Sequence, residues 1–356
     1  MKKRMILICI TMLLLCGCGK KMGENVSIDM PTSAETMEVP VLDKIPIPET
    51  QNLLTGVADL SKEAIGKRPV AVMINNVEPA LPQYGIGQAD VIFELPVEGD
   101  QTRIMALYAD YTKVPDVCSV RSCRYYFPAI ANGFDAFYIH WGAAQTILGY
   151  VDSIGVDRYD GISNPGGLFA RDSQRKSAGY SLEHTGYFKG TDFASVVQND
   201  GSRIELKDAK KDTAFSFCEM GTIVTPEGDD CSYAQVKFGA STTVFKYNAD
   251  ENVYYKEMNG HTHIDGKTKE QLSFTNVFLL ETSISVRDDV GHKQINWKGS
   301  STSNGYYISN GKVQKIHWSQ KDENSYLKFY DENGNELLLN RGKTYVGYTY
   351  ENRITL

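Results

Sequence analysis

The side chains best suited to binding chemistry are arginines that fall at the expected ends of strands and helices in the first half of the chain. A guanidinium group presents a fork of N–H donors that matches carboxylate and phosphate groups, so converging arginines predict a site for an anionic ligand. In the alternative interpretation Arg103 forms a structural ion pair with Glu94 or Glu98, and the other arginines are solvated. Spacing alone leaves both interpretations open. The candidate ligand-binding residues are Arg103, Arg121, Arg124, Arg171 and Arg175.

A second set of residues could carry acid–base chemistry. His140 ends an apolar run and precedes a turn of small residues that leaves room for a ligand. A histidine at a strand end beside carboxylates can serve as a general base, although a structural, hydrogen-bonded histidine explains the same pattern. The candidate catalytic residues of this alternative are Glu94, Glu98 and His140.

Signals for a metal or a nucleophile are weak. His261, His263 and Asp265 alternate along an expected strand and so share one face, but a polar surface hairpin is the preferred explanation. Ser173-x-x-Lys176 has the spacing of a Ser–Lys pair, yet it falls in an expected charged loop rather than at a helix start. The sequence contains no Gly-x-Ser-x-Gly, phosphate-binding loop or dinucleotide-binding motif. We therefore expect no metal and no cofactor.

The first eighteen residues predict where the protein resides. Three basic residues precede the apolar stretch 5–15, which has the charge order and length of a secretory signal. The following Leu15-Cys16-Gly17-Cys18 is typical of a lipoprotein cleavage site, with Cys18 as the residue that receives the lipid. Two acyl chains, such as palmitate, suffice for stable anchoring. The sequence thus predicts a signal peptide at 1–17 and attachment to the extracytoplasmic face of the cell membrane.

Composition narrows the class of partner. The chain has 37 Lys plus Arg against 44 Asp plus Glu, a net charge of −7, which argues against a nucleic-acid partner. Beyond Cys18, four cysteines could form two disulfides or remain free thiols, and their spacing does not fit a zinc site. Cys123 also lies at an expected helix start, which would lower the pKa of its thiol. The four cysteines are Cys118, Cys123, Cys218 and Cys231.

The remaining chain divides into a tether and two domains. Residues 18–66, with the lipidated cysteine at their start, are polar, contain four prolines and are typical of a flexible tether, although 52–65 could order as a short docking piece or helix. Strand and helix patterns alternate in 67–211, which predicts an α/β domain with a mixed sheet. Short alternating strands in 212–356 predict a mostly antiparallel β domain. The fold class is therefore α+β.

The same patterns place individual elements. Buried strands are expected at 70–74, 90–97, 103–109 and 136–140, and helices at 122–132, 144–154 and 191–198. Two-residue hairpin turns are expected where Asn precedes Gly, because both residues tolerate a positive φ. These turns are Asn259-Gly260, Asn310-Gly311 and Asn333-Gly334.

Several segments, taken together, resemble the YerB-like family of lipoproteins over about 54–348. The segments are Arg68-Pro-Val-Ala-Val-Met-Ile-Asn-Asn76, Pro82-Gln-x-Gly85-Ile, Ala89-Asp90-Val-Ile-Phe-Glu94, Val120-Arg-Ser-x-Arg124, Phe169-x-Arg171-Asp-x-x-Arg175-Lys176 and Leu339-Asn-Arg-Gly342-Lys-Thr. The resemblance implies a two-domain, membrane-anchored lipoprotein and implies no particular reaction. Cys123 replaces the family's Ala, and 177–181 lack the family's Ala-Pro-His-Asn, so a nucleophilic Cys123 and a catalytic histidine there are both disfavoured.

These observations favour a lipid-anchored protein that binds an anionic or glycan ligand of the cell envelope. Its expected partners are the membrane, through the lipid, and a cell-wall glycan or anionic polymer. One alternative is a cell-envelope hydrolase or transferase that uses Glu94 or Glu98 with His140 as acid and base. Another alternative is a protein–protein scaffold at the membrane surface.

Overall fold

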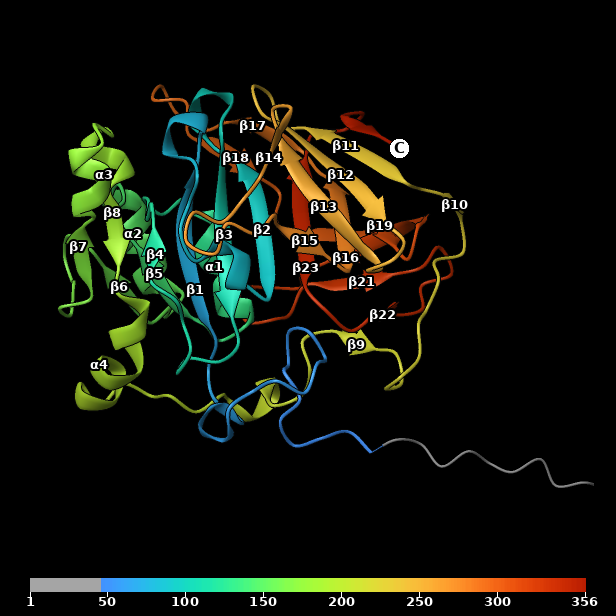
Figure 1. The fold of residues 1–356 in the computed structure, drawn as a ribbon, viewed down its shortest axis with the longest axis horizontal. Coiled ribbons are helices and arrows are strands. Elements are labelled where there is room, and N and C mark those ends of the chain that lie inside the picture. Colours follow the sequence, from blue (N-terminus) through green and yellow to red (C-terminus); the bar gives the residue numbers. More distant parts are fainter. Residues whose placement is uncertain (1–45) are drawn as a thin grey trace, which may run out of the picture. The chain divides into compact units, whose positions relative to one another are not determined.

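The computed structural model describes residues 46–356, so the predicted signal peptide, Cys18 and most of the predicted tether lie outside the described residues. One mixed sheet of eleven strands runs through both halves of this part of the chain (Figure 1). Its order is β10-β20-β19-β16-β23-β2-β3-β1-β5-β6, and β21 pairs with β20. Its strands are β1 (Val70–Asn76), β2 (Val91–Pro96), β3 (Thr102–Tyr108), β5 (Phe137–His140), β6 (Arg158–Asp160), β10 (Asp229–Asp230), β16 (Asn276–Glu281), β19 (Gly299–Ser309), β20 (Lys312–Ser319), β21 (Lys328–Tyr330) and β23 (Thr344–Thr349).

Apolar patterns explain the strands in the N-terminal half of the sheet. β1 is buried along its whole length, as a continuous apolar run predicts for a strand covered on both faces. It pairs antiparallel with β3 and parallel with β5. The four expected strands correspond to β1, β2, β3 and β5, with small differences at their ends.

The two halves of the chain meet inside this sheet. β2 pairs antiparallel with β3 on one side and parallel with β23 on the other, which places Ile92 opposite Tyr345. The division between 67–211 and 212–356 stays a prediction, and strands from both sides of it share one sheet.

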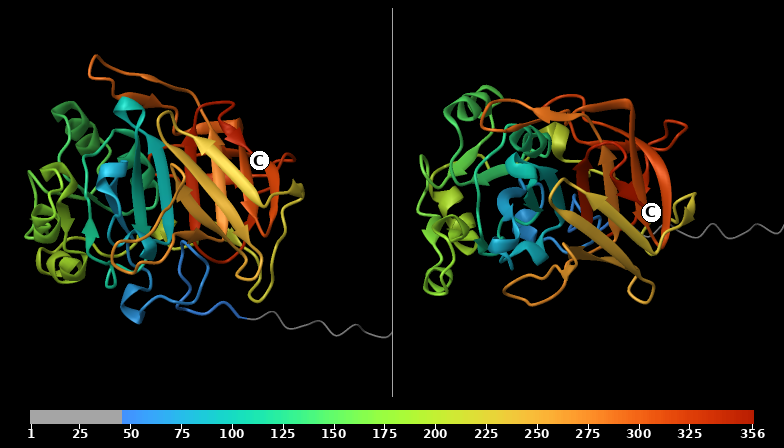
Figure 2. Two further views of the ribbon diagram at one scale, coloured as in Figure 1. Left: turned by 45° about the horizontal axis from the view of Figure 1, so that its top comes forward. Right: turned by 90° about the horizontal axis from the view of Figure 1, so that it is seen from above.

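A second sheet of six strands packs against the C-terminal part of the first (Figure 2). Phe245 and Phe274 of the second sheet contact Tyr345 of β23, with ring centroids 4.7 Å and 5.5 Å apart. Within the described residues most strand pairs after residue 212 are antiparallel, and the α+β class is confirmed. The second sheet contains β11 (Tyr233–Lys237), β12 (Thr242–Asn248), β13 (Val253–Met258), β14 (His261–Thr262), β15 (Ser273–Phe274) and β24 (Ile354–Thr355). The smaller sheets contain β4 (Val117–Cys118), β7 (Phe169–Arg171) and β8 (Gly186–Phe188), then β9 (Ser216–Phe217) with β22 (Leu338–Leu339), and β17 (Ile284–Val286) with β18 (Lys293–Ile295).

The four α-helices of the described residues are short, and all of them lie in the N-terminal half (Figure 1). The helix expected at 122–132 begins only at Tyr126, because tertiary contacts engage the preceding backbone: Arg103 takes the carbonyl of Ser122, and Cys123 N–H donates to Gly142. The α-helices are α1 (Tyr126–Gly133), α2 (Gln145–Ser153), α3 (Ser173–Ser177) and α4 (Phe193–Asn199). The 3₁₀-helices are η1 (Lys62–Ala64), η2 (Glu78–Ala80), η3 (Ile86–Gln88), η4 (Glu98–Asp100), η5 (Leu182–His184), η6 (Gly190–Asp192) and η7 (Asp208–Lys210).

Two local expectations differ from the structure. Ser173 opens α3 instead of lying in a loop, because the Asp172 side chain accepts the Arg175 N–H and caps the helix. In addition, part of the predicted tether is packed, since Leu54 and Ala64 are buried in the core. Folded structure therefore begins before residue 67.

The Asn-Gly steps make two of the three expected hairpin turns. Asn259-Gly260 and Asn310-Gly311 have positive φ at both residues and close the β13–β14 and β19–β20 hairpins. Asn333-Gly334 lies in a longer loop, in which Asp331 N–H donates to the carbonyl of Asn335. The side chain of Asp331 also accepts from the backbone of Asn333 and Asn335, which stabilises the longer loop.

Candidate functional site

A cavity of about 170 Å³ lies where β1 ends and β3 begins, and it combines charged and neutral polar side chains. The chain brings its wall together from four places: the end of β1, the segment from η4 into β3, the loop after β4, and η5. Two of the predicted arginines, Arg103 and Arg121, line it together with Glu98. The lining residues are Asn75, Val77, Val97, Glu98, Gln101, Thr102, Arg103, Arg121, Glu183 and His184.

Arg103, Glu98 and Arg124 form one ion cluster at this cavity. Arg103 donates through its Nη2 to Glu98 Oε1 at 3.0 Å, and through its Nη1 to the Ser122 carbonyl at 2.7 Å. Arg124 binds the same carboxylate with two donors, one of them its Nε at 2.7 Å from Oε2. The sequence-based alternative, in which Arg103 pairs with Glu98, therefore describes a contact that is present, and Arg124 shares it.

Burial and neighbouring charges shift the pKa values of Glu98 and Arg103 in this cluster. Burial alone would raise the pKa of Glu98, but the hydrogen bond from Arg124 and the charges of Arg103 and Arg124 outweigh it and lower that pKa to about 2. Burial, together with the nearby charges of Arg124 and Arg121, lowers the pKa of Arg103 to about 10. The charges of Arg124 and Arg121 thus repel that of Arg103, and the carboxylate of Glu98 offsets part of this repulsion.

Arg121 and Glu183 form a more exposed ion pair on the same wall. Their charged atoms are 3.0 Å apart, and the side chains are 25% and 52% exposed. Next to them His184 is buried, and its Nδ1 lies 2.9 Å from the side-chain amide of Asn75. An amide donor at Nδ1 places the ring proton on Nε2, and burial lowers the pKa of His184. Neutral His184 therefore presents an N–H donor beside the Arg121–Glu183 pair.

The guanidinium groups of Arg103 and Arg121 on the cavity wall are not fully hydrogen-bonded. Among the described residues, the Nε atoms of Arg103 and Arg121 are buried and have no hydrogen-bond partner. An unpaired buried donor typically costs about 1–3 kcal/mol, so each of these Nε atoms adds a local cost to the fold.

The remaining predicted arginines serve other contacts. Arg171 lies over the Trp141 ring at 4.1 Å and donates to the Leu182 carbonyl. Arg175 is buried, donates to the carbonyls of Ala80, Pro82 and His184, and stacks on tyrosine rings, although its own Nε is also unpaired. Neither residue lines the cavity that contains Arg103 and Arg121.

Glu94 belongs to a buried polar network between the two halves of the chain. Its carboxylate accepts from Asn76, Thr102 and Tyr345 at 2.8–2.9 Å and lies 3.3 Å from the Lys256 ammonium. Lys256 also donates to His263, whose other ring nitrogen donates to Gln83 at 2.9 Å. The side chains of Glu94 and Lys256 are fully buried.

His263 corrects the expectation of a polar surface hairpin. It is buried in the network just described, whereas His261, two residues earlier, is exposed. Burial and the charge of Lys256 hold the pKa of His263 well below its ordinary value. His263 is therefore a neutral link of the network.

His140 is buried away from the cavity wall. Its Nδ1 donates to the Gly142 carbonyl at 3.2 Å, while Nε2 has no partner among the described residues. Burial lowers its pKa to about 4, against the opposing charge of Asp160. Of the candidate catalytic residues Glu94, Glu98 and His140, only Glu98 lines the cavity, so the structure does not gather the three around it.

The C-terminal half holds the loop that carries Glu98. The carbonyl of Asp100, at the end of η4, accepts the Ala240 N–H at 2.9 Å, and the Asp100 carboxylate lies 3.2 Å from the Lys293 ammonium. Asp100 has a positive φ of 54°. Contacts from Ala240 and Lys293 thus fix one wall of the cavity.

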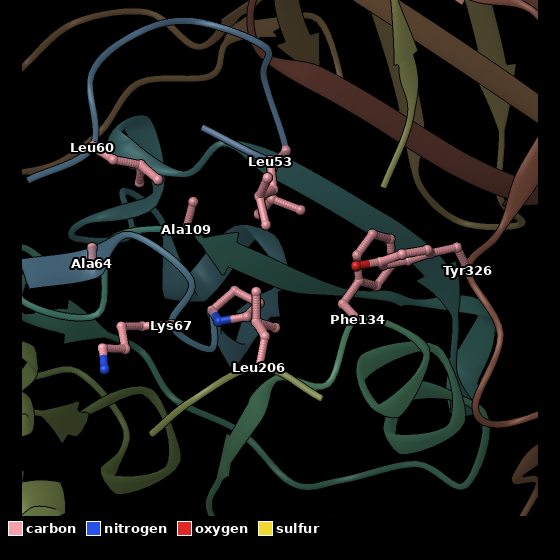
Figure 3. Close-up of a pocket in the computed structure, with 10 residues that line it drawn as sticks. Leu53, Leu60, Ala64, Lys67, Ala109, Phe134, Leu206 and Tyr326 are labelled. Carbon is pink, nitrogen blue, oxygen red and sulfur yellow. The ribbon is translucent and has the colours of Figure 1, made fainter. Parts of the chain in front are cut away.

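A separate apolar cavity lies under the first described residues (Figure 3). Its volume is about 20 Å³, and Leu53, Leu60, Phe134 and Tyr326 are among its lining residues. Lys67 also lines it, but its ammonium extends away and pairs with Glu205 at 2.9 Å. This volume holds about one water molecule, so the cavity is too small for a ligand.

Other site classes find little support in the described part of the chain. Within residues 46–356 no three His, Cys, Asp or Glu side chains gather closely enough to hold a metal ion. Cys118, Cys123, Cys218 and Cys231 are buried free thiols, and burial raises the pKa of Cys123 to about 12, the opposite of the expected shift. Within residues 46–356, no helix is long and apolar enough to span a bilayer.

Of the charged residues on this wall, Glu183 is the one that the sequence did not indicate as a site residue. Glu183 and His184 lie in the short helix η5, where no periodic pattern marks them. Asn75 is the second-to-last residue of β1, and the two asparagines that end this apolar run were the available signal.

Comparisons with known proteins agree with the sequence resemblance. Residues 54–203 match the model described as "Protein of unknown function (DUF3048) N-terminal domain", and residues 234–346 match the corresponding C-terminal domain. The chain is 27% identical over 327 residues to "Putative lipoprotein YerB" of Bacillus subtilis (strain 168), covering 90% of this chain and 88% of that protein. The crystal structure of YerB from Bacillus subtilis has the same fold, with a TM-score of 0.72 and 24% identity over 85% of this chain and 97% of that one. The chain therefore belongs to the DUF3048 family, and its similarity to YerB confirms the resemblance expected from the sequence motifs.

Proposed function

We propose that this protein is a lipid-anchored protein of the cell envelope that binds an anionic ligand in the cavity lined by Arg103 and Arg121. The name of the Bacillus subtilis relative and the signal and Cys18 motif of this chain support the anchor. The expected location is the extracytoplasmic face of the membrane, where anionic wall polymers and glycans carrying acidic groups are available partners.

The convergence of Arg103 and Arg121 on one cavity is the observation that carries the proposal. With Arg124 they supply three positive charges, which Glu98 and Glu183 balance only in part. A bound anion would neutralise the remaining positive charge, and it could accept hydrogen bonds from the guanidinium groups and from His184. The same geometry gives less support to hydrolysis, because Glu94 and His140 are buried outside this wall.

The cavity volume limits what enters it. An engineered apolar cavity of roughly 150 Å³ accepts benzene, so about 170 Å³ fits a phosphate, a carboxylate or the end group of a longer chain. We therefore infer that the cavity binds one end group of a polymer rather than a whole saccharide.

Retention on purified cell-wall material tests the proposal. The full chain, purified in detergent, is compared with Arg121→Gln and with Arg158→Gln, a matched control in which an arginine of β6 pairs with the exposed Asp152. We expect the wild type and Arg158→Gln to be retained and to bind inorganic phosphate, and Arg121→Gln to lose both. Retention should also fall when anionic polymers are stripped from the wall. Unchanged retention of Arg121→Gln would refute the proposal.

A further inference from the structure

The wall of the cavity carries acidic as well as basic side chains, and the acidic side chains restrict the class of ligand further than the arginines do. Glu98 and Glu183 line the same wall as Arg103 and Arg121. A site that only captures anions gains nothing from carboxylates on its wall, because like charges repel. Their presence needs an explanation from the fold or from the ligand.

The two carboxylates differ in how fully the protein engages them. Glu98 is held by Arg103 and by two donors of Arg124, so its charge is used within the protein. Glu183 is half exposed. Its carboxylate forms an ion pair with Arg121 at 3.0 Å and lies 3.7 Å from the ring of neutral His184. Contacts within the protein therefore account for the carboxylate of Glu98. The carboxylate of Glu183 has one cationic partner, Arg121.

Anion binding changes the surroundings of Glu183. An anion bound by Arg121 competes with Glu183 for the same guanidinium group and leaves two negative charges at one cation. A positive group on the ligand, adjacent to the anion, would restore the balance by pairing with the Glu183 carboxylate.

We infer that the ligand is zwitterionic: its anionic group binds the guanidinium groups of Arg103 and Arg121, and an ammonium group beside it binds Glu183. This inference rests on the proposed function and specifies its ligand class. A phosphate monoester or a carboxylate with a primary amine a few bonds away fits the description. Glu183 is then the residue that selects such a ligand over a simple anion.

A matched pair of ligands tests this assignment. Propyl phosphate and 2-aminoethyl phosphate have nearly the same shape, and only the second carries an ammonium group. Titration calorimetry with the full chain in detergent should show 2-aminoethyl phosphate binding about two- to fivefold more tightly, the range expected for one partly exposed ion pair.

The variant Glu183→Gln separates selection from simple competition. It should tighten propyl phosphate, by removing a competing carboxylate, and weaken 2-aminoethyl phosphate, by removing the ammonium partner. Glu205→Gln, which removes an exposed acid paired with Lys67, is the control and should change neither affinity. A parallel change of both ligands in Glu183→Gln, or equal affinities in the wild type, would overturn the inference and leave the anion site standing. If neither ligand binds, the proposed function fails as well.

Discussion

Replacing Glu98 with Gln removes the carboxylate shared by two buried arginines. The amide keeps the shape of the side chain but not the charge, so Arg103 and Arg124 face each other without their common counterion. Because both guanidinium groups are largely buried, water compensates little of the lost attraction. We expect Glu98→Gln to destabilise the fold.

The shifted pKa sets the size of this effect. The ordinary pKa of Glu98 is 4.5, and in the fold it is about 2. At 1.36 kcal/mol for each pKa unit, the charged form contributes about 3 kcal/mol to folding. Since the pKa is lowered in the fold, this stability is fully present above pH 4.5 and is lost as the pH falls toward 2.

Urea unfolding at several pH values tests this reasoning. Glu98→Gln should be less stable than the wild type by about 3 kcal/mol at pH 7, and the difference should shrink to about half of that at pH 3. The exposed-pair variant Glu205→Gln should unfold like the wild type at both pH values. If Glu98→Gln costs less than about 1 kcal/mol, or if its cost is independent of pH, the shared-carboxylate description is wrong. The variant should also bind phosphate more tightly, because the cavity gains a net positive charge.

Two further predictions concern buried groups outside the cavity. His140, whose pKa falls from 6.5 to about 4 on burial, makes folding less favourable as the pH drops through this window, because the unfolded chain takes up a proton that the folded chain rejects. Relative to His140→Gln, the wild type should therefore lose about 3 kcal/mol between pH 7 and pH 4 in urea unfolding, and a difference that does not vary with pH would contradict the buried neutral ring. Lys256→Met leaves the Glu94 carboxylate buried without its cation and should cost about 3–5 kcal/mol, whereas the double variant Glu94→Gln with Lys256→Met should recover much of that loss. Equal stability of the single and double variants would show that the two groups are not coupled.

Apolar pattern was sufficient to locate the strands of the N-terminal half but not to pair them across the chain. β1, β2, β3 and β5 are buried runs whose residue types identify them locally. The pairing of β2 with β23 joins residues about 250 positions apart, and the sequence of neither strand indicates which strand it pairs with. Burial of His263 was missed for a related reason: its partners Lys256 and Gln83 come from different parts of the chain.

The five arginines show why residue type alone does not define a site. Arg175 and Arg103 are both buried. The guanidinium group of Arg175 donates mainly to backbone carbonyls, whereas Arg103 lines a cavity. A guanidinium group serves both purposes because its donors fit backbone carbonyls as well as carboxylates. Only the surroundings, which tertiary folding supplies, distinguish an arginine that holds loops together from one that is available to a ligand.

Hydrogen bonds connect the cavity to the C-terminal half. Lys256 donates to His263, His263 donates to Gln83, and Gln83 donates to the carbonyl of Asn75. The side chain of Asn75 in turn orients His184 at the cavity wall. The contacts of Ala240 and Lys293 with Asp100 fix the loop that carries Glu98 on the other side. Because the cavity residues all come from the N-terminal family domain while Lys256, His263, Ala240 and Lys293 come from the C-terminal one, we expect the geometry of the cavity to require both domains to be folded against each other.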